Sequence, residues 1–321
     1  MLQYVLFVAG FVFLIYGANW LVDGSASLAR KYRIPNIVIG LTIVSLGTSA
    51  PELVVNLIAS FRGAADVAIG NIVGSNISNI LLILGISAII YPLAVNDNTQ
   101  WKEVPLALLA AIVFAVLAND TFFDGIDRSM IYRSDGIVLV AFFILFMYYT
   151  FGIARLEETH PQVDVSEFSN RRSVLMIIGG LAGLVIGGRW IVDGAVSIAA
   201  MLGMSEALIS ITIIAVGTSL PELAACVAAA IKKNPGIVIG NIIGSNIFNI
   251  FFVLGVSSVI RPIPFNLKMN FDVNVAIFAS AILFIFLLLP RKKILERWQG
   301  YALLAFYVMY IIVLLLREQI I

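Results

Sequence analysis

The sequence has almost none of the residues on which metal clusters and nucleophilic catalysis usually depend. Its 321 residues include one cysteine, Cys226, and one histidine, His160. A single cysteine excludes a disulfide framework and a cysteine-based metal cluster within the chain. A single histidine, in the most polar stretch, argues against a histidine-ligated metal site or a Ser-His-Asp triad. We therefore expect no resident cofactor.

Charge is scarce and evenly balanced. Charged residues make up 12% of the chain, against about 25% in an ordinary soluble domain. The 20 basic and 19 acidic residues nearly cancel, so the basic excess of a nucleic-acid-binding protein is missing. We expect no nucleic-acid partner.

Apolar sequence instead extends over nearly the whole chain. Hydrophobic residues account for 61% of it, and the mean hydropathy is +1.03. The 25 glycines are typical of transmembrane helices that approach one another closely. This composition predicts a multi-pass integral membrane protein surrounded by a lipid bilayer.

Polar interruptions divide the chain into segments near the length of about 20 residues that a helix needs to cross a bilayer. We predict an all-α protein with ten transmembrane helices, at 2–22, 36–61, 67–91, 103–118, 135–153, 173–193, 206–231, 236–260, 271–289 and 299–316. The first segment lacks the basic start and the cleavage site of a signal peptide. With the amino terminus outside, 13 of the 20 basic residues fall on the cytoplasmic side, as the positive-inside rule favours.

The two halves of the sequence resemble each other. Residues 17–92 align without a gap onto residues 187–262, at a constant offset of 170. The run Gly-Thr-Ser-x-Pro-Glu occurs in both halves, and nine of the eleven residues at 70–80 are identical to those at 240–250. The sequence therefore contains an internal repeat.

The repeat is predicted to be inverted. Five helices in each half is an odd number, so the second half must enter the membrane from the opposite side. We expect a first repeat at 1–153, a short cytoplasmic loop at 154–172 and a second repeat at 173–321. Inverted repeats are typical of secondary transporters, whose sites lie near the midplane where the repeats meet.

Each half carries one glutamate deep inside an apolar segment, Glu52 and Glu222. An ionisable group there costs on the order of 2.5 kcal/mol or more, which indicates a functional role. Pro51 and Pro221 directly precede the glutamates. Because proline lacks an amide donor and clashes with the carbonyl four residues earlier, we predict breaks in helices 2 and 7.

The breaks are expected to free oxygen atoms for a cation. We predict that the carbonyls of residues 45–48 and 215–218 lose their intrahelical partners, while Ser49 and Ser219 add hydroxyl groups. Oxygen ligands with two carboxylates suit a hard cation such as Ca²⁺.

The next helix of each half adds a small polar face. Ser75 and Asn79 are four residues apart and therefore share one helix face, as do Ser245 and Asn249. Either motif alone could serve helix packing, but a carboxylate retained in both halves favours a function.

At these residues the sequence resembles the sodium/calcium exchanger family of the cation/Ca²⁺ antiporter superfamily, in its prokaryotic branch. The resemblance covers essentially the whole chain. It implies an antiporter that exchanges Na⁺ for Ca²⁺ by alternating access. Ca²⁺ would bind Glu52, Glu222 and the carbonyls of Thr48 and Thr218.

The resemblance also implies positions for Na⁺, which would share the two carboxylates with Ca²⁺. Asn79 and Asn249 would line the central position. The further Na⁺ ligands would be Ser49, Ser219, Ser75, Ser245 and the carbonyls of Ser45 and Ala215.

Two departures from the family pattern refine these expectations. Many members carry an aspartate at the position of Asn249, where the acid is associated with K⁺ co-transport, so Asn249 argues against K⁺ dependence. Two carboxylates balance one Ca²⁺, but three Na⁺ would leave the site positive, which keeps Ca²⁺/H⁺ antiport open. The loop at 154–172 is too short for a Ca²⁺-sensing domain.

Other classes remain as alternatives. An enzyme that uses two carboxylates inside the membrane is disfavoured because no activated nucleophile is visible. A cation channel is a further alternative, distinguished by ion flux that needs no counter-ion. We do not expect the protein to be an enzyme. We expect it to function as a monomer in a prokaryotic cytoplasmic membrane.

We hypothesise that the helices at 2–22 and 173–193 slide past the core. The glycines that would give them smooth surfaces are Gly10, Gly17, Gly179, Gly180, Gly183, Gly187 and Gly188. Asp23, Asp193 and Arg189 lie near helix ends, where we expect them to extend to the membrane interface.

Overall fold

A computed structural model describes residues 2–123, 125, 127–156, 168–201, 215–289 and 293–320. The first part of the predicted seventh helix, 206–214, lies outside these residues, as does His160 with most of the predicted loop.

The first half of the chain is built from long helices, some of them in consecutive pieces. Its helices are α1 (Leu2–Tyr32), α2 (Asn36–Ile39), η1 (Gly40–Val44), α3 (Ser45–Thr48), α4 (Ala50–Arg62), α5 (Ala65–Ile77), η2 (Ser78–Leu84), α6 (Gly85–Ile90), η3 (Thr99–Glu103), α7 (Val104–Leu117), α8 (Asp120–Phe123) and α9 (Arg133–Leu156). Two short strands, β1 (Leu93–Ala94) and β2 (Met130–Ile131), lie between them. The pieces η1, η2 and η3 are π-helical.

The second half repeats this order over its described part. Its helices are α10 (Asn170–Met201), α12 (Ala215–Thr218), α13 (Leu220–Ile231), α14 (Pro235–Ile247), the π-helical η5 (Phe248–Leu254), α15 (Gly255–Ile260), the 3₁₀ turn η6 (Leu267–Met269), α16 (Asn270–Leu288) and α17 (Arg297–Ile320). Its strands are β3 (Ile263–Pro264) and β4 (Ile294–Leu295).

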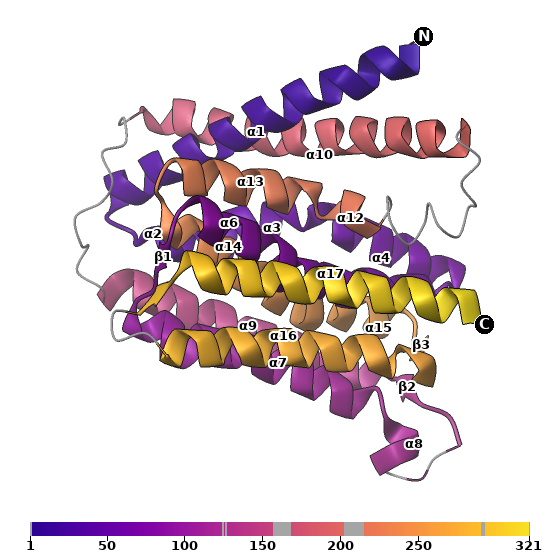
Figure 1. The fold of residues 1–321 in the computed structure, drawn as a ribbon. Coiled ribbons are helices and arrows are strands. Elements are labelled where there is room, and N and C mark those ends of the chain that lie inside the picture. The colour runs from indigo at the N-terminus through magenta and orange to yellow at the C-terminus, as the bar shows by residue number, and fades with distance from the viewer. Residues whose placement is uncertain are drawn as a thin grey trace.

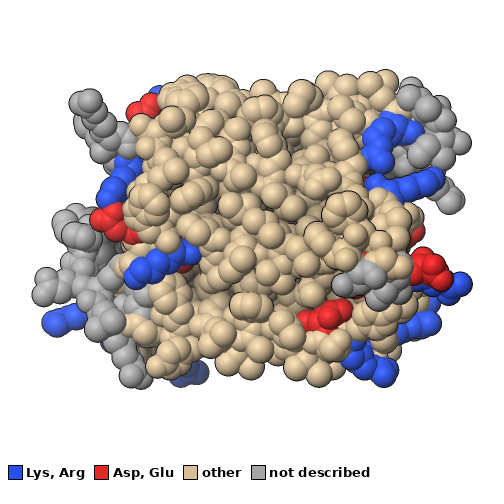
Figure 2. All heavy atoms as spheres, turned by 90° about the horizontal axis from the view of Figure 1, so that it is seen from below, with Lys and Arg blue, Asp and Glu red and all other residues tan. Residues whose placement is uncertain are grey.

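The helices lie roughly parallel in one bundle, with both termini at the same end (Figure 1). Eight helices in the described part of the chain are long and apolar enough to cross a membrane, and the bent pair 36–48 and 50–62 makes a ninth candidate. The two stretches Ala65–Ile90 and Pro235–Ile260 are the most buried of them and form the centre. Charged side chains gather toward the two ends, with an uncharged band between them (Figure 2). The structure is that of an integral membrane protein.

Short strands pair at the ends of the bundle (Figure 1), and the sequence does not predict them. Strand β1 pairs with β4 in antiparallel register, Leu93 opposite Leu295, and β2 pairs with β3, Ile131 opposite Ile263. Each strand has only two residues, too few to produce a recognisable period in the sequence.

Helix α1 extends ten residues beyond its predicted end at residue 22. The extension is polar in sequence yet buried: Ser25 and Ser27 are inaccessible, and the Ser27 hydroxyl accepts hydrogen bonds from Phe168 N (2.9 Å) and Ser173 Oγ (3.0 Å). A partner helix therefore continues the burial after the apolar run ends.

Helices α1 and α10 lie side by side along one face of the bundle (Figure 1). A methyl group on Gly17 would lie 2.8 Å from Gly180 O, and one on Gly187 would lie 2.6 Å from Gly10 O. Glycine thus lets the two backbones touch. We call this contact the glycine seam.

The glycine seam modifies the sliding hypothesis. Gly10, Gly17, Gly180, Gly183 and Gly187 all face the partner helix of the seam. Gly188 instead faces Leu220 and Pro221 of the core at 3.8 Å or more. These glycines mainly join α1 to α10, because each helix presents its small residues to the other rather than to the core.

Candidate cation site

The predicted helix breaks are present. Between α3 and α4 the chain bends by 46°, and Ser49 has φ −85° and ψ 8° at the break. Ser219 has nearly the same conformation, φ −88° and ψ 5°, between α12 and α13. Pro51 and Pro221 lie in the first turn after each break, where a missing amide hydrogen is tolerated.

One detail of that prediction is wrong. The carbonyl of Ser45 keeps its helical partner, because Ser49 N donates to it at 3.0 Å. Proline removes only its own amide, so the carbonyl that loses its donor is the one four residues before Pro51, that of Gly47. A carbonyl has two lone pairs, so Ser45 O can still contact a cation beside this bond.

The two carboxylates are buried at the centre, each side chain 1% exposed. Ser75 Oγ donates to Glu52 Oε1 at 3.4 Å within the first half. Ser49 Oγ, also from the first half, donates to Glu222 Oε1 at 2.9 Å in the second. Ser245 Oγ lies 2.9 Å from Ser49 Oγ, so Ser49 and Ser75 contact the carboxylates directly and Ser245 lies next to Ser49.

The second oxygen of each carboxylate is unpaired. Oε2 of Glu52 and Oε2 of Glu222 are buried and accept no hydrogen bond from the described residues. A buried, unpaired carboxylate oxygen is costly unless a ligand satisfies it. These two atoms are candidate ligands for a cation.

Four asparagines join the two halves beside the carboxylates. Asn79 Nδ2 donates to Asn246 Oδ1 at 2.9 Å, and Asn249 Nδ2 donates to Asn76 Oδ1 at 3.1 Å. The remaining oxygens, Asn79 Oδ1 and Asn249 Oδ1, are buried without a donor. In Asn79 and Asn249, both predicted as site residues, the amide oxygen is therefore the atom left available for a ligand.

The other predicted residues lie at or next to the breaks. Thr48 is buried at the end of α3, and its hydroxyl donates to Asn241 Oδ1 at 3.0 Å. Ser219 Oγ lies 3.2 Å from Ser78 Oγ. Ala215 begins α12 and Thr218 ends it. Ser45, Ala215 and Thr218 are predicted to offer backbone carbonyls to a cation, and their support is the position of the backbone in α3 and α12.

Sequence reasoning missed three asparagines, Asn76, Asn246 and Asn241. All three are buried, and Asn241 links Thr48 to Cys226, because its Nδ2 donates to Cys226 Sγ at 3.3 Å. Their signal was available, since Asn76 and Asn246 belong to the Gly-Ser-Asn-Ile-x-Asn run of both halves.

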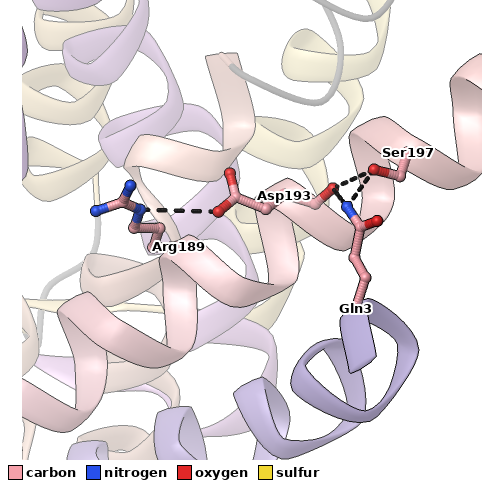
Figure 3. A network of polar contacts seen from close by, with 4 residues as sticks. All are labelled: Gln3, Arg189, Asp193 and Ser197. Atoms are coloured by element: carbon pink, nitrogen blue, oxygen red, sulfur yellow. Dashed lines mark hydrogen bonds and ion pairs between the residues drawn. The ribbon is translucent and has the colours of Figure 1, made fainter. Parts of the chain in front are cut away.

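The charged residues near helix ends behave unequally. Asp23 forms an ion pair, because its Oδ1 lies 2.8 Å from Lys232 Nζ, with 36% and 29% of the side chains exposed. Asp193 and Arg189 are exposed, as predicted, and form a long contact of 3.7 Å within α10. Gln3 from α1 reaches the same turn and bonds to Ser197 and the Asp193 carbonyl (Figure 3).

These donors fit a hard cation better than a transition metal. Among the described residues there is no cluster of three or more His, Cys, Asp or Glu side chains. Two carboxylates with hydroxyl and amide oxygens are ligands typical of Ca²⁺. A bundle of apolar helices with such oxygens at its centre defines a membrane protein with a candidate cation site inside it.

Comparison with known proteins specifies the family. A family model described as sodium/calcium exchanger protein matches residues 2–152 and 172–316. The chain belongs to the sodium/calcium exchanger family.

Individual relatives span the chain almost completely. An uncharacterized membrane protein of Methanocaldococcus jannaschii is 39% identical over 94% of both chains. The sodium/calcium exchanger MaX1 of Methanosarcina acetivorans is 30% identical over 97% of this chain and 98% of its own. A structure of the sodium-calcium exchanger NCX_Mj, soaked with zero Na⁺ and Ca²⁺, superposes with a TM-score of 0.82 at 37% identity, over 98% of this chain and 99% of that one.

Proposed function

We propose that this protein is a secondary antiporter that exchanges Na⁺ for Ca²⁺ across the membrane by alternating access, without using K⁺. The observation that carries the proposal is the set of four unpaired, buried oxygens: Oε2 of Glu52 and Glu222, and Oδ1 of Asn79 and Asn249. One carboxylate and one amide come from each half. The relatives named as sodium/calcium exchangers support the choice of ions.

Ca²⁺ would bind both carboxylates together with the carbonyls of Thr48 and Thr218. Na⁺ would use the same carboxylates, and Asn79 and Asn249 would line the central position. The remaining Na⁺ ligands in this proposal are Ser49, Ser219, Ser75, Ser245 and the carbonyls of Ser45 and Ala215. The hydrogen bond from Ser49 to Glu222, across the two halves, supports a shared site.

The proposed topology has ten membrane helices in two inverted five-helix repeats. The repeats are 1–153 and 173–321, joined by a cytoplasmic loop at 154–172, and the amino terminus lies outside. Matching breaks at Ser49 and Ser219 support the repeat. We place the protein in a prokaryotic cytoplasmic membrane and expect the monomer to be the functional unit.

Coupling follows from the cost of an empty site. Two carboxylates without cations repel each other and are poorly solvated in a dry interior, so the empty, unprotonated site crosses the membrane unfavourably. Either Ca²⁺ or Na⁺ must neutralise Glu52 and Glu222 before the site changes sides. Competition for the same oxygens then makes the process an exchange.

Ca²⁺/H⁺ antiport is the second candidate. The site holds two carboxylates, which balance one Ca²⁺ but leave an excess of positive charge with three Na⁺. Two protons could neutralise the same two groups. The unpaired oxygens Glu52 Oε2 and Glu222 Oε2 would accept them.

The deciding experiment measures radioactive Ca²⁺ uptake by purified protein in liposomes. Na⁺-loaded liposomes are diluted into Na⁺-free medium, with and without K⁺, and an imposed pH gradient replaces the Na⁺ gradient in a control. We expect uptake that requires internal Na⁺, is indifferent to K⁺ and is lost in Glu52→Gln. Uptake driven by the pH gradient alone would establish Ca²⁺/H⁺ antiport, and flux without any counter-ion would indicate a channel.

A further inference from the structure

We propose that Asn76 and Asn246 are positioning residues that fix the amides of Asn79 and Asn249 with their oxygens, not their nitrogens, toward the cation. The inference rests on the proposed cation site. It assigns a role to two residues outside the ligand set.

Backbone carbonyls only accept hydrogen bonds, so any amide atom bonded to one must be a nitrogen. One amide atom of Asn76 lies 3.2 Å from Asn246 O, and one amide atom of Asn246 lies 3.3 Å from Asn76 O. Each of these atoms must be the nitrogen Nδ2. The orientation of both amides is thereby fixed by the main chain.

The fixed amides of Asn76 and Asn246 in turn orient the amides of the proposed ligands. Since Nδ2 of Asn76 is used by a carbonyl, its other amide atom is Oδ1, and the atom of Asn249 that lies 3.1 Å away must be a donor. In the same way, the atom of Asn79 that lies 2.9 Å from Asn246 Oδ1 must be a donor. The amide atom left over on Asn79 and on Asn249 is therefore the oxygen.

The oxygens of Asn79 and Asn249 have no protein partner in the described part of the chain. Both are buried and accept no hydrogen bond from the described residues, and the four asparagine side chains are at most 4% exposed. A reversed amide would place an NH₂ group, with its partial positive charge, at the position that a cation should occupy. It would also set two amide oxygens against each other at the positioning residue.

The arrangement links the two halves reciprocally. Asn246 of the second half orients Asn79 of the first, and Asn76 of the first half orients Asn249 of the second. Each pair of bonds repeats the other at the offset of 170 residues. A change at one positioning residue should therefore act on a ligand from the opposite half.

The test is a double-mutant cycle on Ca²⁺ binding and uptake. In Asn246→Leu the Asn79 amide is free to reverse, so we expect the Ca²⁺ concentration for half-maximal binding to rise about tenfold, the loss of one ligand contact of roughly 1.4 kcal/mol. In an Asn79→Asp background both side-chain oxygens are equivalent and no orientation has to be fixed. There Asn246 Oδ1 would face a carboxylate oxygen instead of a donor, so we expect Asn246→Leu to cause no loss of Ca²⁺ affinity, and any change to be a gain.

A matched control separates positioning from general packing. Gln100 is a buried amide away from the site that also donates to a backbone carbonyl, that of Leu287 at 3.1 Å. Gln100→Leu should leave Ca²⁺ binding unchanged. Asn76→Leu, tested against Asn249→Asp, provides the reciprocal cycle.

The outcomes are distinct. Equal effects of Asn246→Leu in both backgrounds would overturn the positioning role while leaving the cation site intact. A wild-type protein that binds neither Ca²⁺ nor Na⁺ would overturn the proposed function, and this inference with it. Calorimetric binding in detergent gives the same comparison independently of transport.

Discussion

Lys232 Nζ lies 2.8 Å from Asp23 Oδ1 and thereby joins the end of α13 to the last third of α1. The same amine donates to the Asn19 carbonyl at 3.2 Å. The residues at the offset of 170 are Asp193 for Asp23 and Arg62 for Lys232. At that place Asp193 contacts Arg189 of its own helix instead (Figure 3), so the two ends of the molecule are joined differently.

Removing the Lys232 charge should loosen α1 at this end. The ion pair is about one-third exposed, so its contribution is no more than about 1 kcal/mol, or about fivefold in an opening equilibrium. We expect Lys232→Met to speed hydrogen exchange in residues 19–32 by up to that factor, measured by mass spectrometry. Lys233→Met is the control, since Lys233 forms no ion pair with a described residue. Equal exchange in both variants would contradict a role for this pair.

Neutralising either central carboxylate should abolish Ca²⁺ transport without unfolding the protein. Glu52→Gln and Glu222→Gln keep the size of the side chain but remove one of the two negative charges. A bond to a charged group contributes roughly 1.5–3 kcal/mol, so we expect Ca²⁺ affinity to fall by about 10-fold to 100-fold or more. Calorimetry and liposome uptake measure the two effects.

A third buried glutamate provides the control for that experiment. Glu103 is 1% exposed and accepts a hydrogen bond from Tyr149 Oη at 2.8 Å. Glu103→Gln makes the same chemical change outside the candidate site. Loss of Ca²⁺ binding in this variant as well would mean that buried charge in general, not the central pair, is required.

Asn249→Asp should make transport depend on a proton or a further monovalent cation. Asn249 Nδ2 donates to Asn76 Oδ1 at 3.1 Å, and an ionised aspartate would place two acceptors against each other. A protonated aspartate restores the donor, and a bound K⁺ offsets the added charge. Uptake measured on either side of neutral pH, with and without K⁺, should vary in this variant more than in the wild type. Identical profiles would remove Asn249 as a determinant of coupling.

The glycine seam predicts a selective loss of stability. A methyl group on Gly187 would lie 2.6 Å from Gly10 O and 2.8 Å from Leu14 N, both backbone atoms that cannot move aside. We expect Gly187→Ala to destabilise the protein by about 1–3 kcal/mol. Gly152→Ala should be harmless, because nothing lies within 4 Å of its added methyl. The thermal stabilities of the two variants in detergent can be compared by the fraction of protein that stays monodisperse in size-exclusion chromatography after heating.

The parts of the fold that depend on local chemistry could be predicted from the sequence. Pro51 and Pro221 dictate breaks whatever surrounds them, and the breaks occur at Ser49 and Ser219. The end of α1 could not be predicted, because the polar residue Ser27 is buried against Ser173 of a helix from the other half.

In the candidate site, too, some features could be predicted from the sequence and others could not. Buried carboxylates and the serines near them follow from the motif. The bonds from Asn76 and Asn246 to main-chain carbonyls of the opposite half require a position in space that spacing within one motif does not specify. The partner of Asp23 was missed for the same reason, since Lys232 lies 209 residues away in sequence.

The π-helical turns η2 and η5 occupy the same seven positions in each half, at Ser78–Leu84 and Phe248–Leu254. Such a turn holds an extra residue and corresponds to a one-residue insertion in an α-helix. One insertion before the two halves were duplicated accounts for both turns, whereas later insertions would have had to occur twice at matching positions. The geometry around Asn79 and Asn249 is then an ancestral feature, and differences such as Asn56 against Cys226 arose after the gene had doubled.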